Sequence, residues 1–590
     1  MTPPLLQIKN LQVDFTSDGL TSTAIKDINI EVNRGEIVAI VGESGSGKSV
    51  TSLSILQLLP TPPAKYVSGE ILYHDKAGGE IDLLTASSKY LRTTRGNEIA
   101  MIFQEPMTSL NPVQTCGHQV MEAIILHQKI DNNEAKKRTL ALFEKVKLPT
   151  PALLFKRYPH QLSGGQKQRV MIAMAMSCNP SLLICDEPTT ALDVTVQKTI
   201  LLLIKELQQQ QNIGVIFITH DLSVVAEIAD KVVVMYKGKI VEQGSAKDIY
   251  LNPKHAYTKA LLACRPMLHS KGERLPVVSD FMEVSAEGSI VEKPSINIGT
   301  PPTIALQTAG ANDHINAPKD KYEPKQRSLL TVKNLRVWFP VKKPLFGKVK
   351  DYTKAVDDVS FEVFEGETLG LVGESGCGKT TLGRAILRLI EPTSGSILFK
   401  NKDLLSAGRQ QMRDARKDMQ IIFQDPYSSL NPRLTVGAAI AEPLKVHHIG
   451  NSLSQRKEIV MDLLEKVSLK PEHYYRYPHE FSGGQRQRIV IARALALNPS
   501  FIICDESVSA LDVSVQAQVL NLLNDLKKEF GFTAIFISHD LSVVRYISNR
   551  IMVMNKGKIE ETGDAESIYH HPQSPYTQKL IASIPKGLIV

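Results

Sequence analysis

Two patterns of apolar residues alternate along this chain. Segments such as LLQIKNLQVDF and AIKDINIEV, and later LLTVKNLRVWF and AVDDVSFEV, place an apolar residue at about every second position. This spacing predicts half-buried strands of a small antiparallel sheet. Short continuous apolar runs, EIVAIVGE, LLIC and VIFIT, instead predict strands of a parallel sheet that is buried on both faces.

Helical spacing appears between the parallel strands. The segments VMEAIILH and KKRTLALFEKVKL carry apolar residues at intervals of three and four, and related segments follow in the second half of the chain. We therefore predict an α/β protein. Each half should hold a parallel-sheet core with an antiparallel β subdomain and a helical insert.

The chain repeats itself. VAIVGESGSGKS at 38–49 returns as LGLVGESGCGKT at 369–380, and RYPHQLSGGQKQR at 157–169 returns as RYPHEFSGGQRQR at 476–488. The separation is 331 between Lys48 and Lys379, and 319 between Ser163 and Ser482. Such a repeat predicts a duplicated domain, at 1–268 and 329–590. Residues 269–328, rich in Ser, Pro, Gly and Lys and poor in aromatic residues, are predicted to be a flexible linker.

Composition fits a soluble globular protein, with 43% hydrophobic and 22% charged residues. A net charge of +8 spread over 590 residues without a dense basic block does not point to nucleic acid. Six cysteines without a CxxC pair favour a reducing compartment. No segment reaches the roughly 18 uncharged apolar residues of a membrane span, and the N-terminus does not resemble a secretory signal. Work at a membrane would therefore require other subunits.

Two phosphate-binding loops follow predicted strands and precede predicted helices. Both match G-x-x-x-x-G-K-[ST], in which glycines let backbone N–H groups approach phosphates and the lysine neutralises their charge. The serine or threonine that ends each loop supplies a hydroxyl to Mg²⁺. The predicted ATP-binding residues are Gly42, Glu43, Ser44, Gly45, Ser46, Gly47, Lys48 and Ser49, and Gly373, Glu374, Ser375, Gly376, Cys377, Gly378, Lys379, Thr380 and Thr381.

An acidic pair ends a buried strand in each half, in LLICDE and FIICDE. Asp186 and Asp505 are predicted to hold Mg²⁺, and Glu187 and Glu506, one residue later, to polarise the attacking water. Taken alone, this pattern also fits solvated acids at a strand end. Its equal distance from SGGQ in both halves favours the catalytic interpretation.

LSGGQ and FSGGQ are the most specific signals. Together with the phosphate loops, the Gln104 and Gln424 segments, CDE, ALDV and the histidine of THD or SHD, they make both halves resemble ABC ATPases over nearly the whole chain outside the linker. The resemblance implies a head-to-tail sandwich of the two halves. Ser163 and Gly165 would close on nucleotide held by the second loop, and Ser482 and Gly484 on nucleotide held by the first.

The same resemblance implies further roles. Gln104 and Gln424 would sense Mg²⁺ and the attacking water, and His220 and His539 would contact the γ-phosphate. Asp193 and Asp512 would cross the interface between the halves. Phe15 and Phe339 would stack on adenine, although both also fit aromatic residues of a strand core, and Tyr352 is a rival to Phe339. Both sites keep their lysine, glutamate and histidine, so we expect two competent sites, with Cys377 open to thiol reagents unless burial makes it inert.

Two further elements narrow the class. Both halves carry F-Q-[ED]-P-x-[TS]-S-L-N-P and end in a Y-T-x-x-L element, at 255–262 and 574–581. These resemble the bacterial oligopeptide, dipeptide and nickel importers. The resemblance implies a protein on the cytoplasmic face of the cell membrane, held by two permease subunits, that works with a solute-binding protein to power uptake of peptides or peptide-like solutes. The alternative is a soluble tandem ATPase that acts on ribosomes or nucleic acid, but the linker shows no helical arm.

Overall fold

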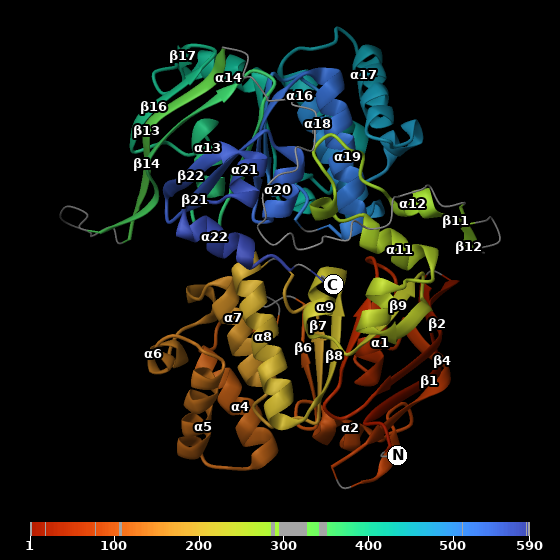
Figure 1. The fold of residues 1–590 in the computed structure, drawn as a ribbon. Helices are drawn as coiled ribbons and strands as arrows, with labels where there is room; N and C mark the ends of the chain where they lie inside the picture. The colour runs from red at the N-terminus through yellow and green to blue at the C-terminus, as the bar shows by residue number, and fades with distance from the viewer. Residues whose placement is uncertain are drawn as a thin grey trace, which may run out of the picture.

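The computed structural model describes residues 3–17, 19–76, 78–104, 109–190, 192–284, 290–293, 327–341, 351–509, 511–585 and 587. Figure 1 shows two halves of similar build, with the red-to-yellow first half below the green-to-blue second half. Each half contains a four-stranded and a six-stranded sheet. The predicted α/β class is thereby confirmed.

The four-stranded sheets are antiparallel. Their orders are β2-β1-β4-β5 and β14-β13-β16-β17. Burial alternates along β1 because successive side chains point to opposite faces of the sheet. The bounds are β1 Leu6–Ser17, β2 Leu20–Val32, β4 Ala64–His74, β5 Glu80–Asp82, β13 Ser328–Pro340, β14 Tyr352–Phe364, β16 Ser394–Phe399 and β17 Lys402–Asp403.

The six-stranded sheets form the cores. Their orders are β10-β9-β3-β8-β7-β6 and β18-β19-β20-β15-β21-β22, with only the β10 and β22 edges antiparallel. Every residue of β3 and β15 is buried, as the continuous apolar runs predict. The bounds are β3 Ile37–Val41, β6 Ile99–Ile102, β7 Leu182–Asp186, β8 Gly214–Thr219, β9 Lys231–Tyr236, β10 Lys239–Ser245, β15 Thr368–Val372, β18 Met419–Ile422, β19 Phe501–Asp505, β20 Thr533–Ser538, β21 Arg550–Asn555 and β22 Lys558–Asp564.

Helices flank the cores and form the predicted inserts. In the first half they are α1 Lys48–Ile55, α2 Ser88–Thr94, α4 Cys116–Gln128, α5 Asn132–Lys145, α6 Pro151–Phe155, η1 Pro159–Gln161, α7 Gly164–Ala175, α8 Val194–Gln211, α9 Leu222–Ile228, α10 Ala246–Leu251 and α11 Ala256–Ala263. In the second half they are α13 Lys379–Ile386, α14 Arg409–Asp418, α15 Pro426–Ser429, α16 Val436–Val446, α17 Leu453–Lys466, η3 Pro471–Tyr475, η4 Pro478–Glu480, α18 Gly483–Leu495, α19 Val513–Phe530, α20 Leu541–Ile547, α21 Ala565–His570 and α22 Pro575–Ala582. Among the described residues, no helix has the length and apolar content to cross a bilayer.

Part of the segment predicted as linker is folded. It follows η2 (Pro266–Leu268) and contains α12 (Val278–Phe281) and a hairpin of β11 (Met282–Val284) and β12 (Ile290–Glu292). Residues 294–326 lie outside the described part of the chain. The polar composition of 269–328 hides a few apolar residues, such as Leu275 and Val277, that are buried. The prediction of a linker across the whole segment is therefore wrong at its start.

Candidate active site

Each phosphate-binding loop joins a buried strand to a helix, β3 to α1 and β15 to α13. Lys48 Nζ lies inside its loop and donates to the carbonyl oxygens of Gly42 and Glu43, at 2.7 and 2.9 Å. Lys379 Nζ makes the equivalent bonds, at 2.8 and 2.9 Å. Both lysines are thus fixed under a turn of backbone N–H groups, the arrangement that binds phosphate.

The last glycine of each loop has a conformation that other residues avoid. Gly47 has φ +100°, and a Cβ there would lie 2.5 Å from Ile25 Cγ2. Gly378 has φ +112°, and a Cβ would lie 2.0 Å from the carbonyl oxygen of Ala355. Glycine is therefore required here both for the backbone angle and for the space.

A hydroxyl and a buried carboxylate lie side by side after each loop. Ser49 Oγ donates to Asp186 Oδ1 at 3.1 Å, and Thr380 Oγ1 donates to Asp505 Oδ1 at 2.9 Å. Burial, with the charge of Glu187 adding to it, raises the pKa of Asp186 to about 6, and burial also raises the pKa of Asp505. A cation beside these carboxylates would offset the cost of burying their charge. Hard oxygen ligands of this kind suit Mg²⁺.

The next residue in each half has an unusual backbone. Glu187 and Glu506 have φ +45° and +48°, in the left-handed region that residues other than glycine seldom occupy. Their N–H groups donate to the carbonyl oxygens of Ile218 at 3.0 Å and Ile537 at 2.9 Å, which holds the turn to the neighbouring strand. Strained residues of this kind cluster at functional sites, because the surrounding structure must hold them in place.

Polar residues that the sequence predicts to be functional contact the Glu187 side chain. Its Oε2 accepts from Gln104 Nε2 at 3.0 Å and from Thr190 Oγ1 at 2.9 Å, and lies 3.4 Å from His220 Nδ1. Burial alone would raise the pKa of Glu187, but the hydrogen bond and charge of His220 and the charge of Lys48 outweigh it and hold this pKa at about 2. The carboxylate is therefore charged, with Lys48 of the phosphate loop near enough to stabilise that charge.

Glu506 occupies the matching position with one difference. Its Oε2 accepts from Gln424 Nε2 at 2.7 Å and lies 3.7 Å from His539 Nδ1, while Lys379 Nζ lies 4.0 Å from Oε1. The hydrogen bond and charge of His539 outweigh burial and lower the pKa of Glu506. Ser509, the counterpart of Thr190, donates to the Glu506 carbonyl at 2.9 Å rather than to its carboxylate. The sequence reasoning missed this hydroxyl, although both halves place one three residues after the glutamate.

The SGGQ segments begin helices. Ser163 accepts from the backbone N–H of Gln166, whose side chain accepts from the N–H of Ser163, so the motif is itself a capping box. Ser482 and Gln485 do the same in the second half. A Cβ at Gly165 would lie 2.7 Å from Val196 Cγ1, and one at Gly484 would lie 2.3 Å from Val515 Cγ1. Contact of these residues with nucleotide across the interface stays a prediction.

The aromatic candidates for adenine differ between the halves. Phe15 is partly buried against the apolar core of the first half. Phe339 and Tyr352 are 41% and 46% exposed and lie on adjacent strands. An exposed ring is available to a base, whereas a packed one also serves the strand core. Stacking on adenine stays a prediction for all three.

The two halves touch at their phosphate loops. Asp512 Oδ2 accepts from the N–H of Ser44 at 2.9 Å, and the Ser514 hydroxyl bonds the carboxylate of Glu43. On the other side Thr195 Oγ1 donates to Glu374 Oε1 at 2.7 Å. Asp193 instead accepts from the N–H of Val196 at 3.0 Å and caps its own helix, α8. Each half therefore reaches the loop of the other.

Two tyrosines that the sequence reasoning used only as class markers also support the loops. The N–H of Glu43 donates to Tyr257 Oη at 3.0 Å, and the N–H of Glu374 donates to Tyr576 Oη at 3.1 Å. These are the tyrosines of the two Y-T-x-x-L elements, on α11 and α22. The sequence signal that could have revealed this role is the recurrence of these tyrosines at the same place in both halves.

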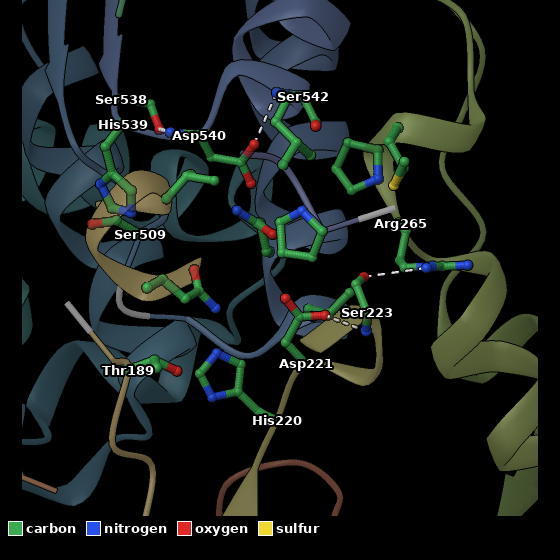
Figure 2. A pocket seen from close by; sticks show the side chains of 18 of the residues that line it. Thr189, His220, Asp221, Ser223, Arg265, Ser509, Ser538, His539, Asp540 and Ser542 are labelled. Carbon is green, nitrogen blue, oxygen red and sulfur yellow. Dashed lines mark hydrogen bonds between the residues drawn. The ribbon is translucent and has the colours of Figure 1, made fainter. Parts of the chain in front are cut away.

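One cavity of about 150 Å³ lies between the halves. Figure 2 shows His220 with Asp221 on one side of it and His539 with Asp540 on the other. Asp221 accepts from the N–H of Ser223 at 2.7 Å, and Asp540 accepts from that of Ser542 at 2.8 Å. Both histidines that contact the glutamates thus also line a shared space.

Comparison with known proteins decides the family. The model described as ABC transporter matches residues 25–190 and 356–509. The glutathione import ATP-binding protein GsiA of Salmonella choleraesuis strain SC-B67 is 48% identical over 588 residues, covering 98% of this chain and 89% of the relative. This chain belongs to the ABC transporter family.

A second family model and a second relative agree with the assignment of an ABC ATPase. The model described as oligopeptide/dipeptide transporter, C-terminal region, matches residues 241–283 and 561–587. GsiA of Escherichia coli strain K12 is 47% identical over 98% of this ABC ATPase and 89% of the relative. A dimeric structure of a bacterial ABC transporter cassette is 28% identical, with a TM-score of 0.36 over 40% of this chain and 98% of that one.

The chain therefore carries two ABC ATPase domains, hydrolyses ATP and is the ATPase subunit of an importer. An import ATPase works with membrane permeases and associates with the membrane through them. The matched relatives are transport proteins, so the comparisons favour this function over a ribosome-associated or nucleic-acid-associated ATPase.

Proposed function

We propose that this chain powers uptake of glutathione or similar short peptides. The support is the 47–48% identity to glutathione import ATP-binding proteins along almost the whole chain, together with the match of both C-terminal regions to oligopeptide and dipeptide transporters. The proposed complex has two permease subunits and a solute-binding protein, with this chain on the cytoplasmic face of the cell membrane.

At each site we propose that Mg-ATP lies on the phosphate loop. Lys48 or Lys379 neutralises the terminal phosphates, and Ser49 with Asp186, or Thr380 with Asp505, holds Mg²⁺ directly or through water. When bound, the ion neutralises charge on the phosphates. Gln104 or Gln424, each bonded to the glutamate of its site, would orient the attacking water beside that carboxylate.

Hydrolysis is assigned to the glutamates. Glu187 and Glu506 are charged carboxylates that polarise the water attacking the γ-phosphate, while His220 and His539 fix the carboxylate and contact the phosphate. The capping serines and packed glycines, Ser163 and Gly165 or Ser482 and Gly484, close the site from the opposite half. The contacts of Asp512 and Thr195 with the opposite loops are the observation that carries this pairing.

The test begins with the intact complex. The tagged chain is solubilised from its native membrane, its partners are identified, and the purified complex is placed in liposomes with its binding protein. We expect two permeases, ATP-dependent uptake of radiolabelled glutathione, and no uptake with the double variant Lys48→Ala, Lys379→Ala. Ribosomes in place of permeases, or ATP hydrolysis without uptake of glutathione or tripeptides, would contradict the proposal.

A further inference from the structure

A segment of the first half is embedded in the second half. Residues 264–281, called the clasp here, leave α11, run along α20 and α19 of the second half, and return to the first half at α12, which packs against α11 (Figure 1). Cys264 and Leu275 are 0% exposed and Val277 is 5% exposed, and all three belong to the apolar core of the second half. Buried contacts of this kind are typical of packing inside a domain, whereas a linker between domains is mostly exposed.

Side chains of the second half also satisfy the backbone of the clasp. Asn521 on α19 accepts from the N–H of Leu275 at 2.9 Å and donates to its carbonyl oxygen at 2.8 Å. Tyr546 on α20 donates to the carbonyl oxygen of Glu273 at 2.6 Å. One amide side chain can pair both backbone groups of a residue because it holds a donor and an acceptor. The backbone groups of Leu275 and the carbonyl oxygen of Glu273 therefore depend on the second half for these hydrogen bonds.

Hydrogen bonds within the clasp, and from the clasp to α11, fix its shape. The N–H of Ser270 donates to Glu273 Oε2 at 3.0 Å, and the N–H of Val277 donates to Asp280 Oδ2 at 2.9 Å. His269 Nε2 lies 2.8 Å from the carbonyl oxygen of Ala263, the last residue of α11. These bonds shape the segment before and after Leu275. The clasp is thus held to the first half at both ends, since it starts from α11 and α12 packs back against α11, and it is buried in the second half between them.

The interface between the halves has two flanks, one where α11 meets α19 and one where α22 meets α8. Among the described residues, the second flank has no buried segment like the clasp. The first-half counterparts of Asn521 and Tyr546 are Leu202 and Glu227, and Leu202 is 56% exposed. There Lys198 Nζ donates to the carbonyl oxygen of Ala582 at 2.7 Å, Thr195 donates to Glu374, and Val194 packs, partly buried, against the core of the second half. These contacts come from partly exposed side chains, whereas the clasp places three fully or almost fully buried residues in that core. The two flanks therefore differ in strength although the halves are repeats.

Each flank belongs to one phosphate loop. Tyr257 on α11 bonds the first loop at Glu43, and Asp512, directly before α19, bonds the same loop at Ser44. The clasp continues from α11 to α19, so it spans the flank of the first site. Tyr576 on α22 bonds the second loop, on the flank without a clasp.

We infer that the clasp is a one-sided hinge that keeps the halves together beside the first phosphate loop, so that they separate mainly beside the second. The inference rests on the proposed pairing of the halves at shared sites, and it adds which of the two sites opens during the cycle. The site on Lys48 stays assembled through the cycle, and the site on Lys379 opens to exchange nucleotide.

The test measures distances across both flanks. Lys259 and Gln578 are exposed counterparts on α11 and α22, and Lys528 and Gln209 are exposed counterparts on α19 and α8. Cysteines introduced as the pairs Lys259→Cys with Lys528→Cys, and Gln209→Cys with Gln578→Cys, accept nitroxide labels, since the six native cysteines are buried. Pulsed electron paramagnetic resonance on the full chain then gives both distances, with and without ATP.

We expect the second pair to shift to longer, broader distances when ATP is removed, while the first pair keeps its distribution. Asn521→Leu, which copies the first half, should make both pairs shift. The reciprocal Leu202→Asn is the matched control and should change neither, and Tyr546→Phe tests the same contact by removing one hydroxyl should Asn521→Leu fail to fold.

Equal shifts of the two wild-type pairs would overturn the hinge, as would an unchanged first pair in both Asn521→Leu and Tyr546→Phe. Neither distance depends on which solute is transported. A failure of glutathione uptake with unequal shifts would therefore reject the proposed function and leave the hinge standing.

Discussion

Replacing Glu187 by glutamine tests the catalytic site most directly. The change keeps the shape of the side chain but removes its charge. Gln104 Nε2, Thr190 Oγ1 and His220 Nδ1 all contact the same oxygen of the wild-type carboxylate, Oε2. The amide oxygen of glutamine can take that position, so the main loss is the negative charge. The variant therefore perturbs both the chemistry and the local electrostatics.

The structure sets the size of the electrostatic effect. A pKa that falls from 4.5 to about 2 corresponds to a preference of about 3 kcal/mol for the charged Glu187 carboxylate in the folded protein. Because this pKa is lowered, the stabilisation is complete above pH 4.5 for as long as His220 is protonated, and it is lost as the pH falls towards 2. At neutral pH, Glu187→Gln should therefore lose up to about 3 kcal/mol of stability.

The catalytic effect should be larger. Loss of a general base typically slows a reaction by about 10²–10⁴-fold. We expect Glu187→Gln and Glu506→Gln each to trap ATP and to reduce steady-state hydrolysis to well under half of wild type, because each composite site uses residues of both halves. Hydrolysis is measured by phosphate release, trapping by retained radiolabelled nucleotide after gel filtration, and stability by thermal unfolding.

Glu70→Gln, at an exposed position of β4, serves as the control and should change none of the three measurements. If Glu506→Gln hydrolyses ATP at the wild-type rate, the second site does not use this carboxylate. If Glu187→Gln leaves the unfolding temperature unchanged, the charge interactions inferred around Glu187 are wrong.

Three further outcomes follow from single contacts. Gly378→Ala should abolish ATP binding at the second loop, because the new Cβ would meet the Ala355 carbonyl oxygen at 2.0 Å, and titration calorimetry should then find one site in place of two. Cys377 should label slowly with N-ethylmaleimide at pH 7, because burial raises its thiol pKa and only 6% of the residue is exposed; rapid labelling that ATP blocks would contradict this. Asp193→Ala should cost about 0.5–2 kcal/mol in thermal unfolding through loss of the α8 cap, and an unchanged melting curve would show that the cap adds nothing.

The sequence predicts the fold well because two signals coincide. Apolar periodicity separates the alternating strands such as β1 from the fully buried β3, and the internal repeat shows that the pattern is not accidental. The loops and the acidic pairs lie where the motifs place them, whereas the contacts of Gln104 and His220 with Glu187 are seen only in the structure.

Other features depend on three-dimensional packing that no motif encodes. Thr190 and Ser509 differ by one methyl group, yet one bonds a carboxylate and the other a carbonyl oxygen. Leu275 stands among polar residues, and its partner Asn521 is 246 residues away, so neither shows a local signal. Tyr257 is conspicuous as part of a repeated element, but its hydrogen bond to the phosphate loop depends on how α11 packs.

Placing both copies in one polypeptide has an evolutionary consequence. In an assembly of two identical chains, every mutation alters both active centres at once, whereas here each substitution changes only one. Cys377 stands where the first half has Ser46, and Ser509 stands where it has Thr190, so the two copies have changed independently. With both copies in one chain, selection can give one centre slower hydrolysis or longer retention of nucleotide than the other, while the two domains keep the same fold.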